Sequence, residues 1–501
     1  MMKFFNFRKP LLISILFALS ILIAYLSVTI NYLFSFLLFI LPLTFLAFLF
    51  IKNARLYMIK NIVTLSLGII LFVLGFSAVI IKDYSYEKDS ISVQNVHVVG
   101  KVTDVREADN YYIVNISDAT IYDFEKEINV KHKITFFISK DKGITRENEN
   151  DIISFTSDIE PNKYIYSRVS NKATKVSDII IEKNNRVSLA TAIKIKVKDN
   201  LDDIMDPVSS SLSFAMLFGE SSIVDDKVYD SYSVSGIVHI LAVSGLHVGF
   251  IISIFSFLFG ILKIRRNISS LIISVFLIFY ASICGFSSSV TRASIMAIIL
   301  FYAKFRGKQY DGLNALSLAA IIILLVNPYS LFSLSFLLSF SSVFGILALT
   351  PIFSHLFLKF LPRRTSNALA VSLGATIATM PFVITYFKRI SLLSLLSNFI
   401  ILPIATIAYM FLFIVTVFAI IIPIIKYLYV PIDYMLRFIT ILVKSVSSQT
   451  KFILNITSSL IANVLFYFGI IIAGDFVFIK SKWMYYVPIF LIVVAIILSI
   501  L

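Results

Sequence analysis

The residues best placed to do chemistry lie in one short segment, Gly236-Ile-Val-His-Ile-Leu-Ala-Val-Ser-Gly-Leu-His-Val-Gly249. His239, Ser244 and His247 stand in a stretch that is otherwise apolar enough to cross a lipid bilayer. Polar groups at membrane depth are costly, and they usually face the interior of a helical bundle or a water-filled path. The segment therefore predicts side chains that line a path through a membrane protein.

The same segment predicts one membrane-spanning helix over Gly236–Leu262. On such a helix His239 and His247 follow i, i+8 spacing, so their rings point to related faces. Gly245 and Gly249 form a G-x-x-x-G step, which lets a second helix approach closely. The competing interpretation is that all these residues only pack and hydrogen-bond neighbouring helices.

Ser244 with His247 also fits an intramembrane serine hydrolase, in which the imidazole would take the proton of the serine hydroxyl. Residues at i and i+3 on one helix are neighbours, but no acidic residue stands nearby in the sequence to orient the imidazole. The hydrolase is the weaker alternative.

A second polar stretch, Gly285-Phe-Ser-Ser-Ser-Val-Thr-Arg292, ends one apolar run and opens the next. A Gly/Ser run of this kind can break a helix, which a membrane protein tolerates where the backbone lines a cavity. Gly285 is a further helix-packing candidate. Arg292 has the planar guanidinium that binds phosphate or carboxylate through two hydrogen bonds. The competing interpretation of Arg292 is a side chain that reaches from a helix end to the membrane surface.

Composition decides the class of protein. The chain has 501 residues, of which 58% are hydrophobic and 15% are charged, with a mean hydropathy of +0.91. A soluble domain carries about 25% charged residues, so a soluble enzyme is excluded and a multi-pass membrane protein is expected. The single cysteine, Cys284, excludes an internal disulfide and a cysteine-built metal site. We expect no metal and no cofactor.

The net charge of +15 reflects membrane topology rather than a nucleic-acid surface. Acidic and basic residues are balanced between Lys82 and Asp199, and the excess of basic residues lies in short clusters between apolar runs. That distribution follows the positive-inside rule. It predicts a cytoplasmic N-terminus and places residues 82–199 outside the cytoplasm. The many acidic residues between Leu201 and Asp230 have no explanation at this level.

The expected fold is an all-α membrane bundle of about 12–13 helices with one small extracytoplasmic β domain. The β domain reads as five strands, for which an OB-type barrel and an ordinary sandwich are both compatible. The expected regions are N-terminal transmembrane helices (1–81), the β domain (82–188), connecting or interfacial helices (189–235), a channel domain (236–425) and C-terminal transmembrane helices (426–501). The run Ile432–Val446 carries charges and is a candidate for an interfacial helix.

The motif His239-Ile-Leu-Ala-Val-Ser-Gly-Leu-His247 resembles the H-x-L-A-x-S-G-L-H signature of the ComEC family of competence proteins, with every fixed position matched. The likeness continues in order through Gly285–Ala293, Asn327–Phe332, Phe336–Phe340, Thr379–Pro381, Ser397–Asn398 and Pro403. One departure is Leu337, where the family usually has glutamine. Long members also carry a metallo-β-lactamase-like domain, whose H-x-H-x-D-H cluster this sequence lacks.

The resemblance implies an inner-membrane channel for uptake of single-stranded DNA, with His239, Ser244, His247 and Arg292 as candidates for the DNA path. The alternative is a secondary transporter of a smaller anionic solute. No phosphate-binding loop is present, so the energy would come from a partner. We expect no enzymatic activity. The expected partners are single-stranded DNA, membrane lipid, a cytoplasmic ATP-driven translocase, a separate nuclease and an extracytoplasmic DNA receptor, and a homo-oligomer is left open.

Overall fold

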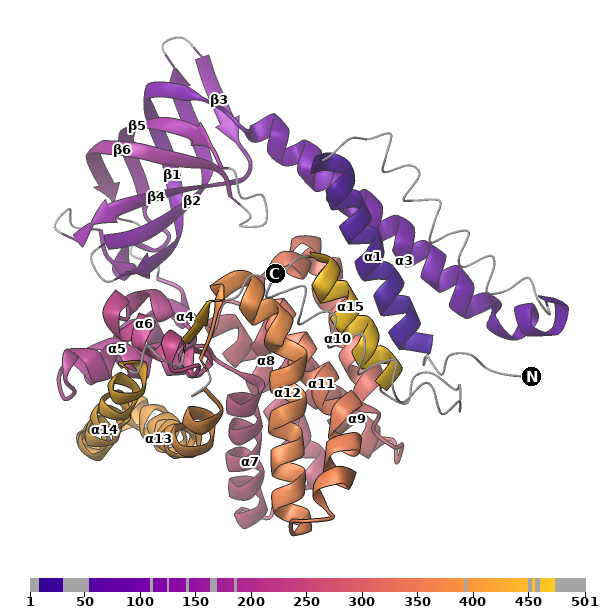
Figure 1. The fold of residues 1–501 in the computed structure, drawn as a ribbon. Coiled ribbons are helices and arrows are strands. Elements are labelled where there is room, and N and C mark those ends of the chain that lie inside the picture. The colour runs from indigo at the N-terminus through magenta and orange to yellow at the C-terminus, as the bar shows by residue number, and fades with distance from the viewer. Residues whose placement is uncertain are drawn as a thin grey trace.

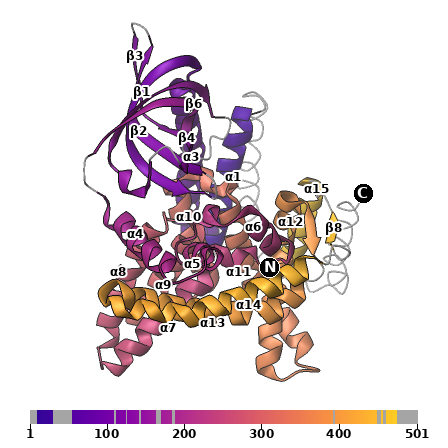
Figure 2. The ribbon, with the colours of Figure 1, turned by 90° about the vertical axis from the view of Figure 1, so that its left-hand side faces the viewer.

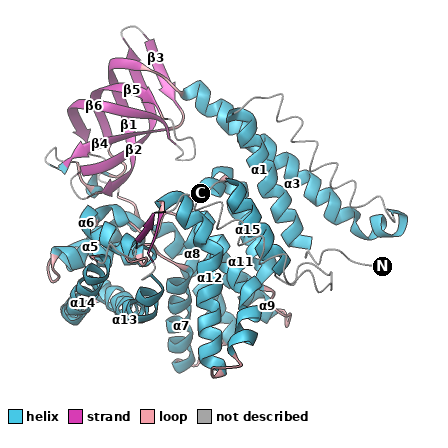
Figure 3. Ribbon diagram, in the orientation of Figure 1, coloured by secondary structure: helices cyan, strands magenta, loops and turns pink. Residues whose placement is uncertain are grey.

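The computed structural model describes residues 9–29, 54–108, 111–123, 126–140, 144–162, 169–183, 187–391, 394–448, 453–455 and 460–473. Within these ranges the chain is mostly helical, and nearly all strands belong to one inserted domain (Figure 3). The predicted architecture of a helical membrane bundle with a β insert is confirmed. Residues 30–53 of the predicted N-terminal transmembrane region and residues 474–501 of the predicted C-terminal one fall outside the described residues.

Two N-terminal helices form an arm beside the bundle (Figure 1). Helix α1 (Lys9–Thr29) packs along α3 (Ala54–Asp89). A Cβ on Gly75 of α3 would lie 2.8 Å from the ring of Phe17, so this glycine lets the two helices approach closely. Because α3 continues past its apolar part to Asp89, it carries the chain directly into the β domain.

The β domain contains six described strands, one more than predicted. The additional strand is short and forms a hairpin with its predecessor. The strands are β1 (Val93–Glu107), β2 (Tyr111–Asp123), β3 (Lys126–Val130), β4 (Lys133–Ser139), β5 (Ile152–Pro161) and β6 (Val169–Glu182).

The order of pairing in the sheet is β1-β5-β6-β4-β2-β3, and β1 also pairs with β2. The sheet therefore closes on itself, because β1 pairs with β5 on one side and with β2 on the other. All pairs are antiparallel except β4–β6, which is parallel. Alternate residues such as Val98, Val114 and Phe136 fill the interior, as the period of two requires. The predicted β domain is confirmed, and its assignment as an OB-type barrel stays a prediction.

The remaining helices build the bundle and, beneath the β domain, a small helical module formed by residues 189–234 (Figure 1). Short 3-10 turns join several of them. The elements are α4 (Leu189–Asp202), α5 (Pro207–Phe218), η4 (Ser221–Ile223), α6 (Asp226–Val234), η5 (Val238–Leu241), α7 (Gly245–Ile261), α8 (Arg266–Ile283), α9 (Ser288–Phe305), α10 (Gly312–Val326), η6 (Pro328–Phe332), α11 (Leu334–Phe357), α12 (Arg363–Phe387), β7 (Arg389–Ser391), α13 (Ser394–Ile421), η7 (Pro423–Leu428), α14 (Tyr429–Ser447), β8 (Ile453–Asn455) and α15 (Leu460–Ala473).

By length and composition, six helices in the described part of the chain could cross a membrane. This number makes the chain a multi-pass membrane protein, as predicted. The six segments are Leu67–Asp89, Arg266–Ile283, Ser288–Phe305, Leu334–Phe357, Arg363–Phe387 and Ile400–Ile421.

Helices α13 and α14 lie across the direction of α7 (Figure 2). The inner face of α14, including Ile432, Leu436 and Val443, is buried, whereas Tyr434 and Phe438 are exposed. Helix α14 is also absent from the six segments that could span a membrane. The assignment of the run Ile432–Val446 as an interfacial helix stays a prediction.

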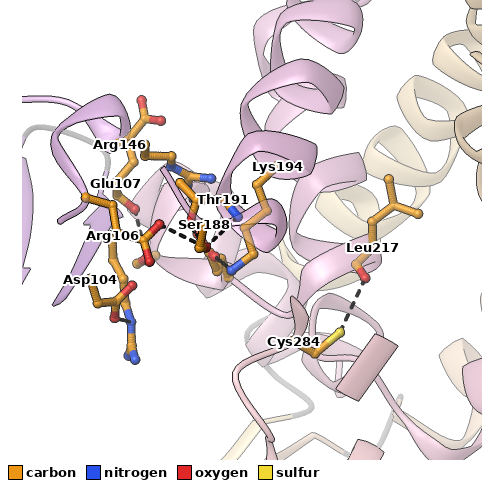
Figure 4. A network of polar contacts seen from close by, with 12 residues as sticks. Asp104, Arg106, Glu107, Arg146, Ser188, Thr191, Lys194, Leu217 and Cys284 are labelled. Atoms are coloured by element: carbon orange, nitrogen blue, oxygen red, sulfur yellow. Dashed lines mark hydrogen bonds and ion pairs between the residues drawn. The ribbon is translucent and has the colours of Figure 1, made fainter. Parts of the chain in front are cut away.

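The β domain is attached to the helices α4 and α5 by two ion pairs that share Glu220, and the two basic partners, Arg146 and Lys194, are labelled in Figure 4. Glu220 accepts hydrogen bonds from Arg146 Nη2 and Lys194 Nζ, both at 2.7 Å. The Arg146 guanidinium also lies 4.4 Å from the centre of the Phe214 ring. At the opposite end of the domain, the Asp89 carboxylate accepts the backbone N–H groups of Lys131 and His132. Two separate attachments therefore hold the domain, one to α4 and α5 and the other to the end of α3 in the N-terminal arm.

The acidic segment from Leu201 to Asp230 now has an explanation: its carboxylates cap helices and pair with basic residues. Asp206 caps α5 by accepting the N–H of Val208, and Asp225 caps α6 in the same way. Asp203 pairs with Lys426 of η7 at 2.9 Å. These acids hold the module together.

Candidate functional site

The segment Gly236–Leu262 is not one helix, and the prediction of a single span here is wrong. Helix α6 ends before Gly236, which has a φ of +80°. The short turn η5 follows, the backbone at Ala242 and Ser244 is extended, and α7 starts only at Gly245. The predicted i, i+8 relation between His239 and His247 therefore does not exist.

The start of α7 is specified by the residues of the motif themselves. Ser244 is the N-cap residue with φ −106° and ψ 168°, and its backbone N–H donates to Nδ1 of His247 at 3.3 Å. This is the return half of a capping box, with histidine in the position that glutamate usually occupies. The S-x-x-H spacing was thus a helix-start signal that the prediction of a continuous helix overlooked.

The structure separates the environments of the two histidines. The His247 side chain is buried, and its ring stacks on Tyr409 of α13 with centroids 3.9 Å apart. Because Nδ1 accepts the backbone hydrogen bond, a neutral His247 carries its proton on Nε2. His239 is exposed on η5.

Arg292 occupies the centre of the candidate site. Its side chain is only 6% exposed, and its guanidinium packs against the first residue of α7, since a Cβ on Gly245 would lie 2.7 Å from Nη2. Its Nε has no hydrogen-bond partner within the described residues, and none of their carboxylates forms an ion pair with it. The hydroxyl groups of its neighbours Thr291 and Ser294 are likewise buried and unpartnered in this part of the structure. Predicted site residues Ser244, Gly245 and Arg292 are therefore brought together.

The electrostatics of this arrangement favour an anion. The N-terminus of a helix carries a partial positive charge, so a guanidinium at the start of α7 adds positive charge to a position that is already positive. A buried charge without a counter-ion is costly. A phosphate or carboxylate between Arg292 and the first turn of α7 would offset the repulsion between the guanidinium and the helix terminus. It would also give the buried guanidinium a counter-ion.

The three predicted packing glycines have different roles. Gly245 packs against the side chain of Arg292 rather than against a second backbone. A Cβ on Gly249 would meet no described atom within 4 Å, so close helix packing has no contact there. Gly285 has a φ of +63° and Phe286 a φ of +50°. Gly285 thus serves the predicted break between α8 and α9, because its backbone conformation favours glycine.

The sequence did not predict a hydrogen-bonded network that links α5, α8 and α13. Tyr280 of α8 donates to the carbonyl of Leu217 at 2.6 Å, and its hydroxyl lies 3.4 Å from that of Tyr409. Cys284 Sγ lies 3.9 Å from the same carbonyl (Figure 4). These groups satisfy the last turn of α5, which would otherwise be an unpaired helix end. No sequence signal identifies this network, since its members come from helices far apart in the chain.

If the chain transports an anionic substrate, as the sequence predicts, replacing Gly245 with alanine reduces cellular uptake of that substrate about tenfold with little loss of stability. The added Cβ must displace the flexible end of Arg292, which moves easily but then no longer lies at the start of α7. Uptake is compared with that of Gly249→Ala, where the added methyl group meets open space. Equal uptake by the two variants would show that the position of Arg292 does not matter.

Comparison with known proteins places this site within a defined domain. The family described as Competence protein matches residues 216–479, which include every residue of the site. The chain is 29% identical over 205 residues to ComE operon protein 3 of Bacillus subtilis, covering 41% of this chain and 26% of that protein. It is 26% identical over 208 residues to Recombination protein 2 of Haemophilus influenzae, covering 38% of this chain and 26% of the relative.

An uncharacterized protein of Aquifex aeolicus is 30% identical over 207 residues, covering 41% of this chain and 46% of the relative. The chain thus aligns with about a quarter to a half of the length of these relatives. No solved structure matches it.

Proposed function

Because this chain belongs to the Competence protein family, we propose that it is a conduit that carries single-stranded DNA across the bacterial plasma membrane during competence. The observation that carries the proposal is that Arg292 places a buried guanidinium at the start of α7 with no counter-ion among the described residues. A strand passing this point would place a phosphate between Arg292 and the first turn of the helix. His239 and Ser244 would lie along the same path.

The proposal assigns the protein a transport role without catalysis. His247 is fixed by the hydrogen bond at Nδ1 and by its stack on Tyr409, so its orientation is set by the start of α7. In the described part of the chain, no group of three or more His, Cys, Asp or Glu side chains could hold a metal ion. An ATP-driven translocase, a nuclease and an external DNA receptor would act as separate partners, and Ser244→Ala should retain uptake.

A smaller anionic solute is the second candidate, since one guanidinium and one helix terminus would also hold a single phosphate or carboxylate. Deletion of the gene, followed by exposure of cells to labelled DNA, separates the two. Loss of label from the cytoplasm with label retained at the cell surface supports the DNA conduit. Unchanged uptake of DNA contradicts it.

Topology gives an independent prediction. With the N-terminus cytoplasmic, the β domain lies outside. In a Cys284→Ser background, the exposed Ser139 replaced by cysteine should react with a membrane-impermeant maleimide in intact cells. Lys308 replaced by cysteine, in the exposed loop between α9 and α10, should react only after lysis. The reverse pattern would invert the proposed orientation.

A further inference from the structure

The positive charge at the Arg292 site is small and fixed. The guanidinium contributes one charge, and the N-terminus of α7, against which it packs, contributes about half a charge. Helices α7, α8, α9 and α13, which contact one another here, carry no acidic residue. Besides Arg292, their only lysine and arginine residues are Arg266 at the start of α8 and Lys304 near the end of α9. Because short turns join α7 to α8 and α8 to α9, both lie at the opposite end of this group of helices.

The hydrogen-bond donors of the site have no acceptors. The buried Nε of Arg292 has no partner within the described residues. The backbone N–H groups of Gly245 and Leu246, the first two residues of α7, have none in the same part of the chain, because the first turn of a helix lacks internal acceptors for its N–H groups. The guanidinium and the helix terminus therefore offer unused donors side by side, an arrangement that suits the oxygens of a phosphate.

We propose that this site accepts a phosphate ester that carries one negative charge and discriminates against one that carries two. A phosphodiester, the linkage between the nucleotides of a strand, carries one negative charge. A terminal phosphate or a free nucleotide carries about 1.5–2 negative charges on its phosphomonoester at pH 7. The guanidinium and the helix terminus together supply about 1.5 positive charges, which neutralise the diester but not a full dianion.

Burial of the site sharpens this difference. The free energy needed to remove an ion from water grows with the square of its charge, whereas its attraction to a fixed positive charge grows only in proportion to its charge. Arg292 is buried, and the first turns of α7 pack the buried Val248 and Ile251 into the apolar core. A second negative charge on the ligand therefore costs more than it gains at this place.

The selectivity has a consequence for transport. That the phosphodiester belongs to DNA rests on the proposed function. For a DNA conduit, the site would take the internal linkages of a strand and leave free nucleotides unbound, including those that a separate nuclease releases. Inorganic phosphate, which is largely doubly charged at neutral pH, would likewise not compete with the strand.

The test follows the Tm of the purified protein in detergent at constant ionic strength, since a ligand that binds only the folded state raises the Tm. Dimethyl phosphate carries one charge throughout, whereas methyl phosphate carries one at about pH 5 and nearly two at about pH 8. Dimethyl phosphate should raise the Tm at both pH values. Methyl phosphate should bind comparably at the lower pH and at least about tenfold more weakly at the higher pH. A change in the site itself, such as a change in the charge of His247, would alter the binding of both ligands, so the ratio of their affinities reports the charge of the ligand.

Arg292→Gln should lose the response to both ligands, and its own unfolding transition shows that it is folded. Arg306→Gln, at the exposed end of α9, is the matched control and should keep the response. The proposal is overturned if dimethyl phosphate leaves the Tm of the wild type unchanged, if methyl phosphate binds as tightly at the higher pH as at the lower, or if Arg292→Gln responds like the wild type. The DNA conduit is tested separately by uptake after gene deletion, so the failure of one proposal is distinguished from the failure of the other.

Discussion

Replacing Arg292 with glutamine is expected to reduce uptake of DNA by at least about tenfold, because a buried hydrogen bond to a charged group contributes about 1.5–3 kcal/mol. The protein should still fold and reach the membrane, since Arg292 forms no ion pair among the described residues that its removal would break. The measurement is entry of labelled DNA into the cytoplasm, normalised to the amount of protein in the membrane.

Arg306→Gln is the matched control, because it removes the same charge from the exposed end of α9. Arg292→Lys should recover only part of the uptake, since an ammonium cannot form the two parallel hydrogen bonds of a guanidinium. Arg292→Met should raise the Tm, because the buried charge is no longer present. A large loss of folded protein in Arg292→Met would instead show that the arginine stabilises the bundle, and the anion site would then be abandoned.

Replacing Gly345 with leucine is expected to destabilise the protein by about 3 kcal/mol and to remove it from the membrane fraction. A Cβ on Gly345 of α11 would lie 2.3 Å from the carbonyl oxygen of Gly374 on α12, and a Cβ on Gly374 would lie 3.0 Å from the carbonyl oxygen of Gly345. The backbones of α11 and α12 therefore touch directly, and no side chain at Gly345 can be accommodated without separating them.

Gly249→Leu tests whether this effect is specific to the contact between α11 and α12. It is the same substitution in another helix of the bundle, at an exposed glycine where an added Cβ meets no described atom within 4 Å. The abundance of Gly249→Leu should match that of the wild type. Similar losses in both variants would mean that leucine is disfavoured for reasons other than the close contact of α11 with α12.

The sequence alone determined the class of protein and the order of its elements. Apolar runs long enough to cross a bilayer, and one polar insert with alternating hydrophobic residues, are local properties of the chain. The bounds of α1, α8, α9 and α12 lie close to those of four apolar runs in the sequence, Leu11–Ile30, Ile268–Gly285, Val290–Phe305 and Ala368–Phe387. The polar residues of the Gly236–Gly249 segment also lie where the structure has a break between helices.

Only the tertiary structure shows where those polar residues lie and what they contact. Hydrophobicity cannot distinguish a helix from a broken segment whose apolar side chains are buried by other helices, so the break before Gly245 was missed. It also cannot show that Arg292 lies beside Gly245, with no carboxylate of the described residues paired to it, or that Tyr280 and Tyr409 meet at α5. The contact between Gly345 and Gly374 depends likewise on which helices cross. Each of these features is a relation between segments distant in the chain, and only packing brings such segments together.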